Sequence, residues 1–160
     1  MKFRCAFATV LSLLMVGHVQ SETLGQPLRF TVSRTAEGPS DKQLGDIWCE
    51  FKNVSEKNVR LLKTPADGNS QRFWFGMMVV GTNGTPVLDT PMGGKISMRG
   101  PKEYILIKPQ EAYHCQLDYS RLIPGLPQGE YSVKVIYRNQ YGVDCFHGML
   151  ESNSIGVEIR

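Results

Sequence analysis

The sequence predicts an all-β protein, an antiparallel β-sandwich of about seven to eight strands. Apolar residues recur at every second position in almost every apolar run, and no stretch of a dozen residues has helical spacing. Gly and Pro gather between the runs, for example in residues 91–94 and 124–129, where they predict turns. This alternation places one side of each strand against a core and the other toward solvent.

The first predicted strands carry the alternation clearly. Residues 28–34 alternate apolar and polar side chains, and residues 46–54 place Ile47, Cys49 and Phe51 on one face. Because side chains of a strand point alternately to its two sides, these three residues should face the core together.

A hairpin is predicted near the middle of the chain. Residues 71–90 contain a long apolar strand, an Asn83-Gly84 turn and a short returning strand. Asn-Gly between apolar runs is a strong hairpin signal, because both residues accept positive φ. The other predicted strands, in chain order, span residues 58–64, 103–109, 111–120, 129–139 and 154–160.

The N-terminus has the pattern of a Sec-type signal peptide. Lys2 and Arg4 precede a mostly apolar run at residues 5–17, and a small-residue cleavage pattern follows at Ser21. The run is shorter than the roughly 20 residues that span a bilayer. We expect cleavage of residues 1–21 and a secreted or periplasmic product, a single sandwich domain of residues 22–160.

The charge balance argues against two classes of partner. The chain has 18 Lys and Arg against 15 Asp and Glu, and losing Lys2 and Arg4 with the signal leaves 16 against 15. No block of basic residues exists to neutralise a row of phosphates, so we expect no nucleic-acid partner. No second long apolar run follows, so we expect no membrane span in the mature chain.

The stretch "YSRLIPGLPQGEYSVKVIYRN" resembles the corner of immunoglobulin-like and fibronectin-type sandwiches. In that corner a tyrosine at the start of a strand reaches back to backbone a few residues upstream, and Tyr131 would be that residue. Residues 46–138, with "ILIKPQE" and "GEYSV", are also similar to the bacterial BsuPI proteinase inhibitors. That resemblance implies a sandwich and, by analogy, an inhibitor that presents loop 91–101 or 121–129 to a protease.

Three cysteines remain after signal cleavage, because Cys5 leaves with the signal. Cys49 and Cys115 each share a strand face with apolar neighbours and should look inward. In an oxidising compartment we expect a Cys49–Cys115 disulfide. Cys145 stays open as an alternative partner for either, and the unbridged state also stays open.

Two patterns suggest metal or catalytic chemistry. Cys145, His147 and Met149 are soft-metal ligand types, and His114 could join them in an envelope protein that binds copper or zinc. However, alternate residues of a strand lie about 6.5 to 7 Å apart, too far to converge on one ion without a tight loop. No nucleophile motif or phosphate loop accompanies them. We therefore expect that the protein binds no metal and no cofactor and is not an enzyme.

Aromatic residues suggest a binding role instead. The apolar run at residues 73–78 is apolar on both faces, so its second face is either covered or part of a contact patch. Trp48, Trp74 and Met78 would anchor such a patch. We expect a non-catalytic module that engages another extracellular or envelope protein, with the protease-inhibitor and metal-binding functions as alternatives. Asn53-Val54-Ser55 and Asn83-Gly84-Thr85 match the N-glycosylation pattern.

Overall fold

The computed structural model describes residues 25–34, 47–64, 71–89, 102–117 and 126–159. These residues form an all-β structure in which every strand pairing is antiparallel, so the predicted fold class is confirmed at this level. The predicted signal peptide lies outside the described residues. The strands are β1 (Leu28–Arg34), β2 (Ile47–Asn53), β3 (Val59–Leu62), β4 (Phe75–Gly81), β5 (Pro86–Asp89), β6 (Tyr104–Ile107), β7 (Ala112–Leu117), β8 (Gly129–Asn139) and β9 (Gly148–Ile159).

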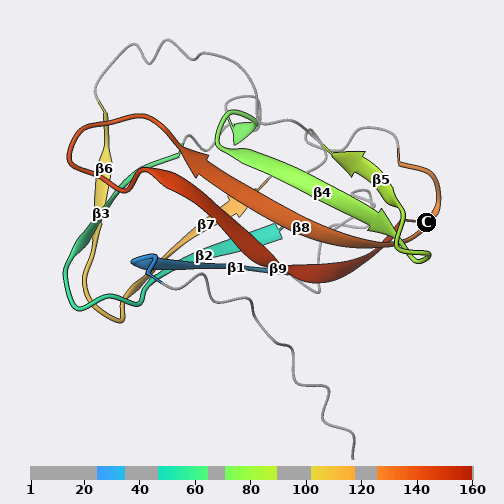
Figure 1. Cartoon of the computed structure of the whole chain (residues 1–160), viewed down its shortest axis with the longest axis horizontal. Helices are drawn as coiled ribbons and strands as arrows, with labels where there is room; N and C mark the ends of the chain where they lie inside the picture. Colours follow the sequence, from blue (N-terminus) through green and yellow to red (C-terminus); the bar gives the residue numbers. More distant parts are fainter. Residues whose placement is uncertain (1–24, 35–46, 65–70, 90–101, 118–125, 160) are drawn as a thin grey trace, which may run out of the picture.

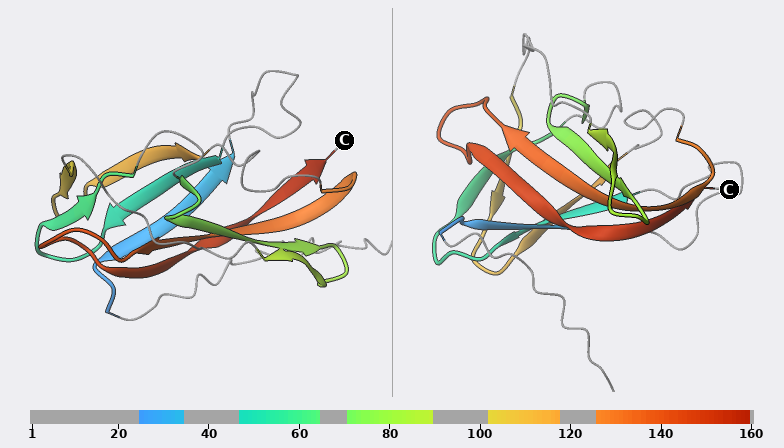
Figure 2. Two further views of the ribbon diagram at one scale, coloured as in Figure 1. Left: turned by 90° about the horizontal axis from the view of Figure 1, so that it is seen from above. Right: turned by 45° about the vertical axis from the view of Figure 1, so that its right-hand side comes forward.

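The strands form two main sheets and one separate ribbon. One sheet has the order β1-β2-β7 and the other has the order β5-β4-β8-β9. Figure 2 shows these two sheets as layers, and Figure 1 shows β3 and β6 as a ribbon at one end. The two main sheets therefore hold seven of the nine described strands, and the ribbon adds the two that exceed a seven-stranded sandwich.

Aromatic side chains from both sheets meet in the core between the layers. Phe30 of β1 and Phe51 of β2 stack with ring centroids 4.7 Å apart. Tyr137 of β8 meets Phe51 edge-on at 4.8 Å and Phe75 of β4 at 5.4 Å. These four residues belong to a single buried cluster, and such aromatic contacts contribute beyond the burial of their area.

Two of the predicted strands alternate between buried and more exposed side chains. Ile47, Cys49 and Phe51 are all buried in β2, and the residues between them are more exposed. Along β8 the inward positions after Tyr131 are all buried, ending at Asn139, while the positions between them are not. The period of two that predicted each strand therefore also identified its core face.

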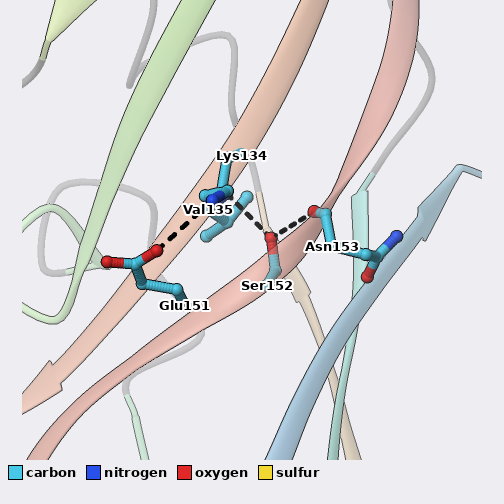
Figure 3. A network of polar contacts seen from close by, with 5 residues as sticks. All are labelled: Lys134, Val135, Glu151, Ser152 and Asn153. Carbon is cyan, nitrogen blue, oxygen red and sulfur yellow. Dashed lines mark hydrogen bonds and ion pairs between the residues drawn. The ribbon is translucent and has the colours of Figure 1, made fainter. Parts of the chain in front are cut away.

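A β-bulge joins the two sheets at one edge. Between β8 and β9 the register shifts so that two residues of β9 oppose Val135. The Ser152 hydroxyl takes the place of a ladder acceptor, accepting from Val135 N at 2.9 Å, and donates to Asn153 O (Figure 3). The Asn153 side chain points to β1, where its amide accepts from Val32 N at 2.8 Å and donates to Val32 O at 3.0 Å.

Two turns match their sequence signals. Gly84 has a φ of 78°, and Gly81 and Thr85 are hydrogen-bonded across the β4–β5 turn at 3.0 Å. The Tyr131 hydroxyl donates to Pro127 O at 2.9 Å, four residues upstream. This is the backbone contact expected of Tyr131, and it holds the chain entering β8.

The last strand begins earlier than predicted. The sequence predicts a strand at residues 154–160, whereas β9 starts at Gly148. The alternation was hidden because the bulge at Ser152 and Asn153 interrupts the period of two, and both residues are polar. Residues 148–151 therefore lie outside the predicted strand although they pair with β8.

Candidate functional site

The β3–β6 ribbon and the loop between β8 and β9 meet at one end of the molecule (Figure 1). Phe146 N in the loop donates to Arg60 O of β3 at 2.7 Å. Val143 N donates to the Tyr104 hydroxyl of β6 at 3.2 Å. The loop is therefore held against both strands of the ribbon by hydrogen bonds from its backbone.

A buried asparagine at the end of β8 holds the β8–β9 loop by hydrogen bonds. Asn139, the last residue of β8, is 1% exposed. Its side chain accepts from Tyr141 N at 2.9 Å and donates to Phe146 O at 2.7 Å. Because these contacts satisfy both ends of the amide inside the protein, the loop conformation is coupled to the packing of β8.

The loop contains two residues in left-handed backbone conformations. Gly142 has a φ of 98°, and a β-carbon there would lie 2.7 Å from Cys145 Sγ. Asp144 has a φ of 52°, a region that non-glycine residues enter rarely and Asp more readily than most. Such strain persists only where the surrounding contacts enforce it, and it gathers at functional sites.

Large side chains are exposed where the loop and ribbon meet. The Arg60 guanidinium lies 3.8 Å from the centre of the Tyr104 ring. Leu106, directly opposite Arg60 in the β3–β6 register, is 57% exposed, and Val143 is 64% exposed. Lys102 is exposed just before β6. We call Arg60, Lys102, Tyr104, Leu106 and Val143 the ribbon–loop surface.

The charged residues around this surface affect the pKa of Cys145. Burial raises the pKa of the Cys145 thiol, while a hydrogen bond from Asn139 and the nearby charges of Arg60 and Lys102 act in the opposite direction. Asp144 adds a smaller effect that raises this pKa.

The structure brings only two of the four candidate metal ligands, Cys145 and His147, to a common contact. Cys145 Sγ contacts Tyr141 O at 3.3 Å, His147 Nε2 contacts the same carbonyl at 3.1 Å, and Met149 is exposed on β9. His114 lies on the other sheet, with its Nε2 3.1 Å from Glu50 Oε2. Within the described ranges, no group of three or more His, Cys, Asp or Glu side chains has the arrangement of a metal site.

The predicted binding patch of Trp48, Trp74 and Met78 requires a correction. Trp74 is only 1% exposed and packs edge-on against Tyr141, so it belongs to the core rather than to a surface. Trp48 is 40% exposed on β2, but Met78 is half-buried on β4 in the other sheet. On the second face of residues 73–78, Trp74 is thus covered and Met78 is half covered, and Trp48, Trp74 and Met78 form no common patch.

Three polar residues on the outer face of the β1-β2-β7 sheet are of the types found in catalytic triads, a hydroxyl, an acid and a histidine. Here the acid lies between the other two. Thr31, Glu50 and His114 lie side by side across the three strands. Glu50 stands in the middle, accepting from Thr31 Oγ1 at 3.4 Å and contacting His114 at 3.1 Å. Nucleophilic catalysis needs the base beside the nucleophile, which this order does not provide.

The two predicted cysteine partners lie opposite each other. In the β2–β7 register, Cys49 pairs directly with Cys115. Cys145 lies in the β8–β9 loop, and all three are free thiols in this structure. The predicted bond is thus not formed here, although the register favours the Cys49–Cys115 pairing over either pairing with Cys145.

The two glycosylation motifs differ in accessibility. Asn53 is 0% exposed, and its side-chain nitrogen donates to Lys57 O at 2.7 Å and to Ile107 O at 2.8 Å. Asn83 is exposed in the β4–β5 turn. Asn53 is therefore a structural residue that closes the turn after β2, and only the Asn83 motif presents its amide to solvent.

No protein-family model matches this chain, and no curated protein matches it either. The part of the chain that the structure describes holds no helix long and apolar enough to cross a membrane.

Sequence reasoning missed the residues of the ribbon–loop surface, although a signal for them exists. In "EYILIKP" apolar side chains occupy both faces of a short strand, which is the pattern noted for residues 73–78. In β6 the second face is exposed through Leu106. A second signal is the asparagine that ends the inward alternation of β2 and β8, at Asn53 and Asn139, where each side chain anchors the turn that follows.

Proposed function

We propose that the protein is a secreted or periplasmic, non-catalytic binding module that engages another protein through the ribbon–loop surface. The observation that carries this proposal is the exposure of Leu106 and Val143 beside the stacked pair of Arg60 and Tyr104. Large apolar side chains grouped on a surface mark interaction sites when polar groups border them. Arg and Tyr are among the residues that most often dominate binding energy at protein interfaces.

The surface is also prepared for binding. Hydrogen bonds from Phe146 N to Arg60 O and from Val143 N to the Tyr104 hydroxyl hold loop and ribbon together. The guanidinium of Arg60 is placed over the Tyr104 ring rather than left free in solvent. Groups that are already ordered lose less conformational entropy on association, so more of their interaction energy contributes to affinity.

The chemistry of the surface indicates the partner's chemistry. Arg60 and Lys102 favour a carboxylate, and Leu106 and Val143 favour an apolar side chain next to it. We therefore propose a segment of an extracellular or envelope protein that carries an acidic residue beside an apolar one.

A peptide display library of random dodecamers, selected on the immobilised chain, tests this proposal. Enriched peptides should pair Asp or Glu with an apolar residue. In fluorescence polarisation, Arg60→Ala and Leu106→Ser should each weaken binding about tenfold, the size of a typical hot-spot loss. Trp48→Ala is the matched control, because it removes an exposed aromatic from the other sheet. Peptides that depend on Trp48 and tolerate both other variants would contradict the proposal.

Secretion rests on residues 1–21 and has its own test. A chain exported by a Sec pathway should begin at Glu22 when its mature N-terminus is sequenced. An intact Met1 in the exported protein would argue against a cleaved signal.

A protease inhibitor of BsuPI-like type, on an immunoglobulin-like sandwich, is our second proposal. The bond from the Tyr131 hydroxyl to Pro127 O supports it, because it fixes the end of the predicted inhibitory loop 121–129. Most of that loop and loop 91–101 lie outside the described residues. Titration of a subtilisin-type protease should show stoichiometric inhibition. Unchanged protease activity at excess protein would reject this alternative and leave the first proposal standing.

A further inference from the structure

Two cysteines occupy one rung of the β1-β2-β7 sheet. Cys49 of β2 is paired with Cys115 of β7, and both side chains lie on the face that carries the core residues Phe51 and Leu117. Opposite residues of an antiparallel pair have Cα atoms about 4.5 to 5.5 Å apart. That spacing lies inside the range of about 4.4 to 6.8 Å over which disulfides form.

The two thiols differ in access. Cys49 is 0% exposed, in the middle strand of the sheet, whereas Cys115 is partly exposed on its edge strand. Burial raises the pKa of Cys49, and the hydrogen bond from Cys49 lowers the pKa of Cys115. The more accessible sulfur is thus also the one that forms a thiolate more readily.

Cys145 has different surroundings. Its thiol contacts Tyr141 O at 3.3 Å and accepts from Asn139 Nδ2 at 3.7 Å. These contacts hold it against its own loop, and it has no place in the β2–β7 register. The sheet itself therefore selects which two of the three cysteines meet.

We propose that Cys49 and Cys115 form an inter-strand disulfide, and that Cys115 is the thiol that reacts first with an external oxidising disulfide. Oxidised glutathione represents that class of oxidant. The Cys115 thiolate attacks one of its sulfurs, its S–S bond breaks, and one glutathione leaves as a thiolate that takes up a proton.

The second step closes the bridge. Cys49 gives up its proton to solvent and attacks the Cys115 sulfur, and the mixed disulfide breaks to release the second glutathione, which is protonated in turn. The two cysteines together lose two electrons and two protons, and oxidised glutathione gains them to become two molecules of the thiol. Cys115 is thus the entry thiol and Cys49 the resolving thiol.

The test is oxidation of the reduced full chain by oxidised glutathione, followed by mass spectrometry of the intact protein and its peptides. All proteins carry Cys5→Ala and Cys145→Ala, so that only the pair can react. The parent should lose two hydrogens and yield a Cys49–Cys115 linked peptide. Adding Cys49→Ala should trap one glutathione on Cys115. Adding Cys115→Ala should leave Cys49 modified about tenfold more slowly, because that thiol is buried.

Three results would overturn the inference. The first is a chain that retains both thiols under excess oxidant. The second is an equal rate of modification at Cys49 and Cys115. The third, measured in a chain that keeps Cys145, is a disulfide between Cys145 and either of the other two cysteines. Circular dichroism establishes that each variant is folded. If Cys49→Ala does not fold, rapid alkylation of the parent during oxidation decides the order: the early mixed disulfide must map to Cys115, and one on Cys49 would contradict the proposal.

Discussion

The sandwich core and the ribbon–loop surface use similar residues in opposite ways. In the core, Phe51 and Tyr137 pack edge-on at 4.8 Å, and both are wholly buried. At the ribbon–loop surface, Tyr104 contacts Arg60 instead, and neighbouring apolar side chains are more than half exposed. Burial of an aromatic in the first region stabilises the fold, and exposure of Leu106 and Val143 in the second provides contact area for a partner.

This difference separates stability from recognition. Changes in the core should lower the free energy of unfolding, whereas changes on the ribbon–loop surface should leave it nearly unaltered and weaken binding. Changes in the β8–β9 loop should affect both stability and binding. The buried Asn139 side chain is hydrogen-bonded to this loop, whereas Val143 in the loop is exposed.

The largest expected loss of stability follows from Phe51→Ala. Phe51 contacts the rings of Phe30, Phe75 and Tyr137, so its removal leaves a cavity between the two sheets. Urea unfolding followed by circular dichroism should show a loss of about 3 to 5 kcal/mol. A loss below 1 kcal/mol, on the scale of an exposed site, would show that the layers are not packed around this ring.

Reduction of the proposed Cys49–Cys115 disulfide should have the next largest effect. This cross-link would join Cys49 to Cys115 and close the segment of chain between them into a loop. Such a cross-link stabilises a protein by about 2 to 4 kcal/mol, chiefly by constraining the unfolded chain. Urea unfolding with and without reductant measures this difference. Cys115→Ala is the control, because its stability should no longer respond to the reductant.

Gly142→Ala should disturb the loop at an intermediate cost. The new β-carbon would lie 2.7 Å from Cys145 Sγ, at a φ of 98°. Gly84→Ala is the matched control, because Gly84 also has a positive φ, of 78°, but no atom would lie within 4 Å of its β-carbon. Gly142→Ala should lower the free energy of unfolding by about 1 to 3 kcal/mol and abolish peptide binding. Gly84→Ala should lower the free energy of unfolding by less and should leave peptide binding intact. Equal losses in both variants would remove the steric argument.

Tyr137→Phe should raise stability slightly and change its dependence on pH. Among the described residues the Tyr137 hydroxyl has no hydrogen-bond partner, so its removal should stabilise the fold by about 1 kcal/mol. Burial raises the pKa of Tyr137. Above the ordinary pKa of about 10, the unfolded chain then loses a proton that the folded state keeps, and stability falls as pH rises.

Urea unfolding from pH 8 to pH 11 measures that pH dependence. The fall in stability above about pH 10 should be shallower in Tyr137→Phe than in the parent, because the variant lacks this proton. Tyr131→Phe is the control, because Tyr131 is more exposed and its hydroxyl is already bonded to Pro127 O. An identical slope in Tyr137→Phe and the parent would show that the hydroxyl titrates normally.

Much of the fold could be predicted from the sequence. Alternation identified β1, β2 and β8 with their core faces, and Asn83-Gly84 identified the β4–β5 turn. Prediction failed where the period of two was broken. The Ser152–Asn153 bulge hid the start of β9, because its polar side chains bond to Val135 and Val32 rather than face solvent.

The candidate site was much less predictable, because it depends on contacts between distant residues. Arg60 and Tyr104 belong to strands that only the fold brings together, and Val143 reaches them through a loop. The local sequence leaves Trp74 either covered or in an exposed patch, because nothing in it shows that Tyr141 packs against this side chain. Side-chain alternation gives the face of a strand, but not what covers that face.

A chemical-shift map of the ¹⁵N-labelled chain, titrated with a selected acidic–apolar peptide, tests whether the ribbon–loop surface is the part of the molecule that binds. We predict that the largest shift changes fall on Arg60, Tyr104, Leu106 and Val143, and that Trp48 and Glu50 on the other sheet stay unchanged. Shift changes centred on Trp48, with the ribbon–loop surface unaffected, would contradict the assignment of recognition to this end of the molecule.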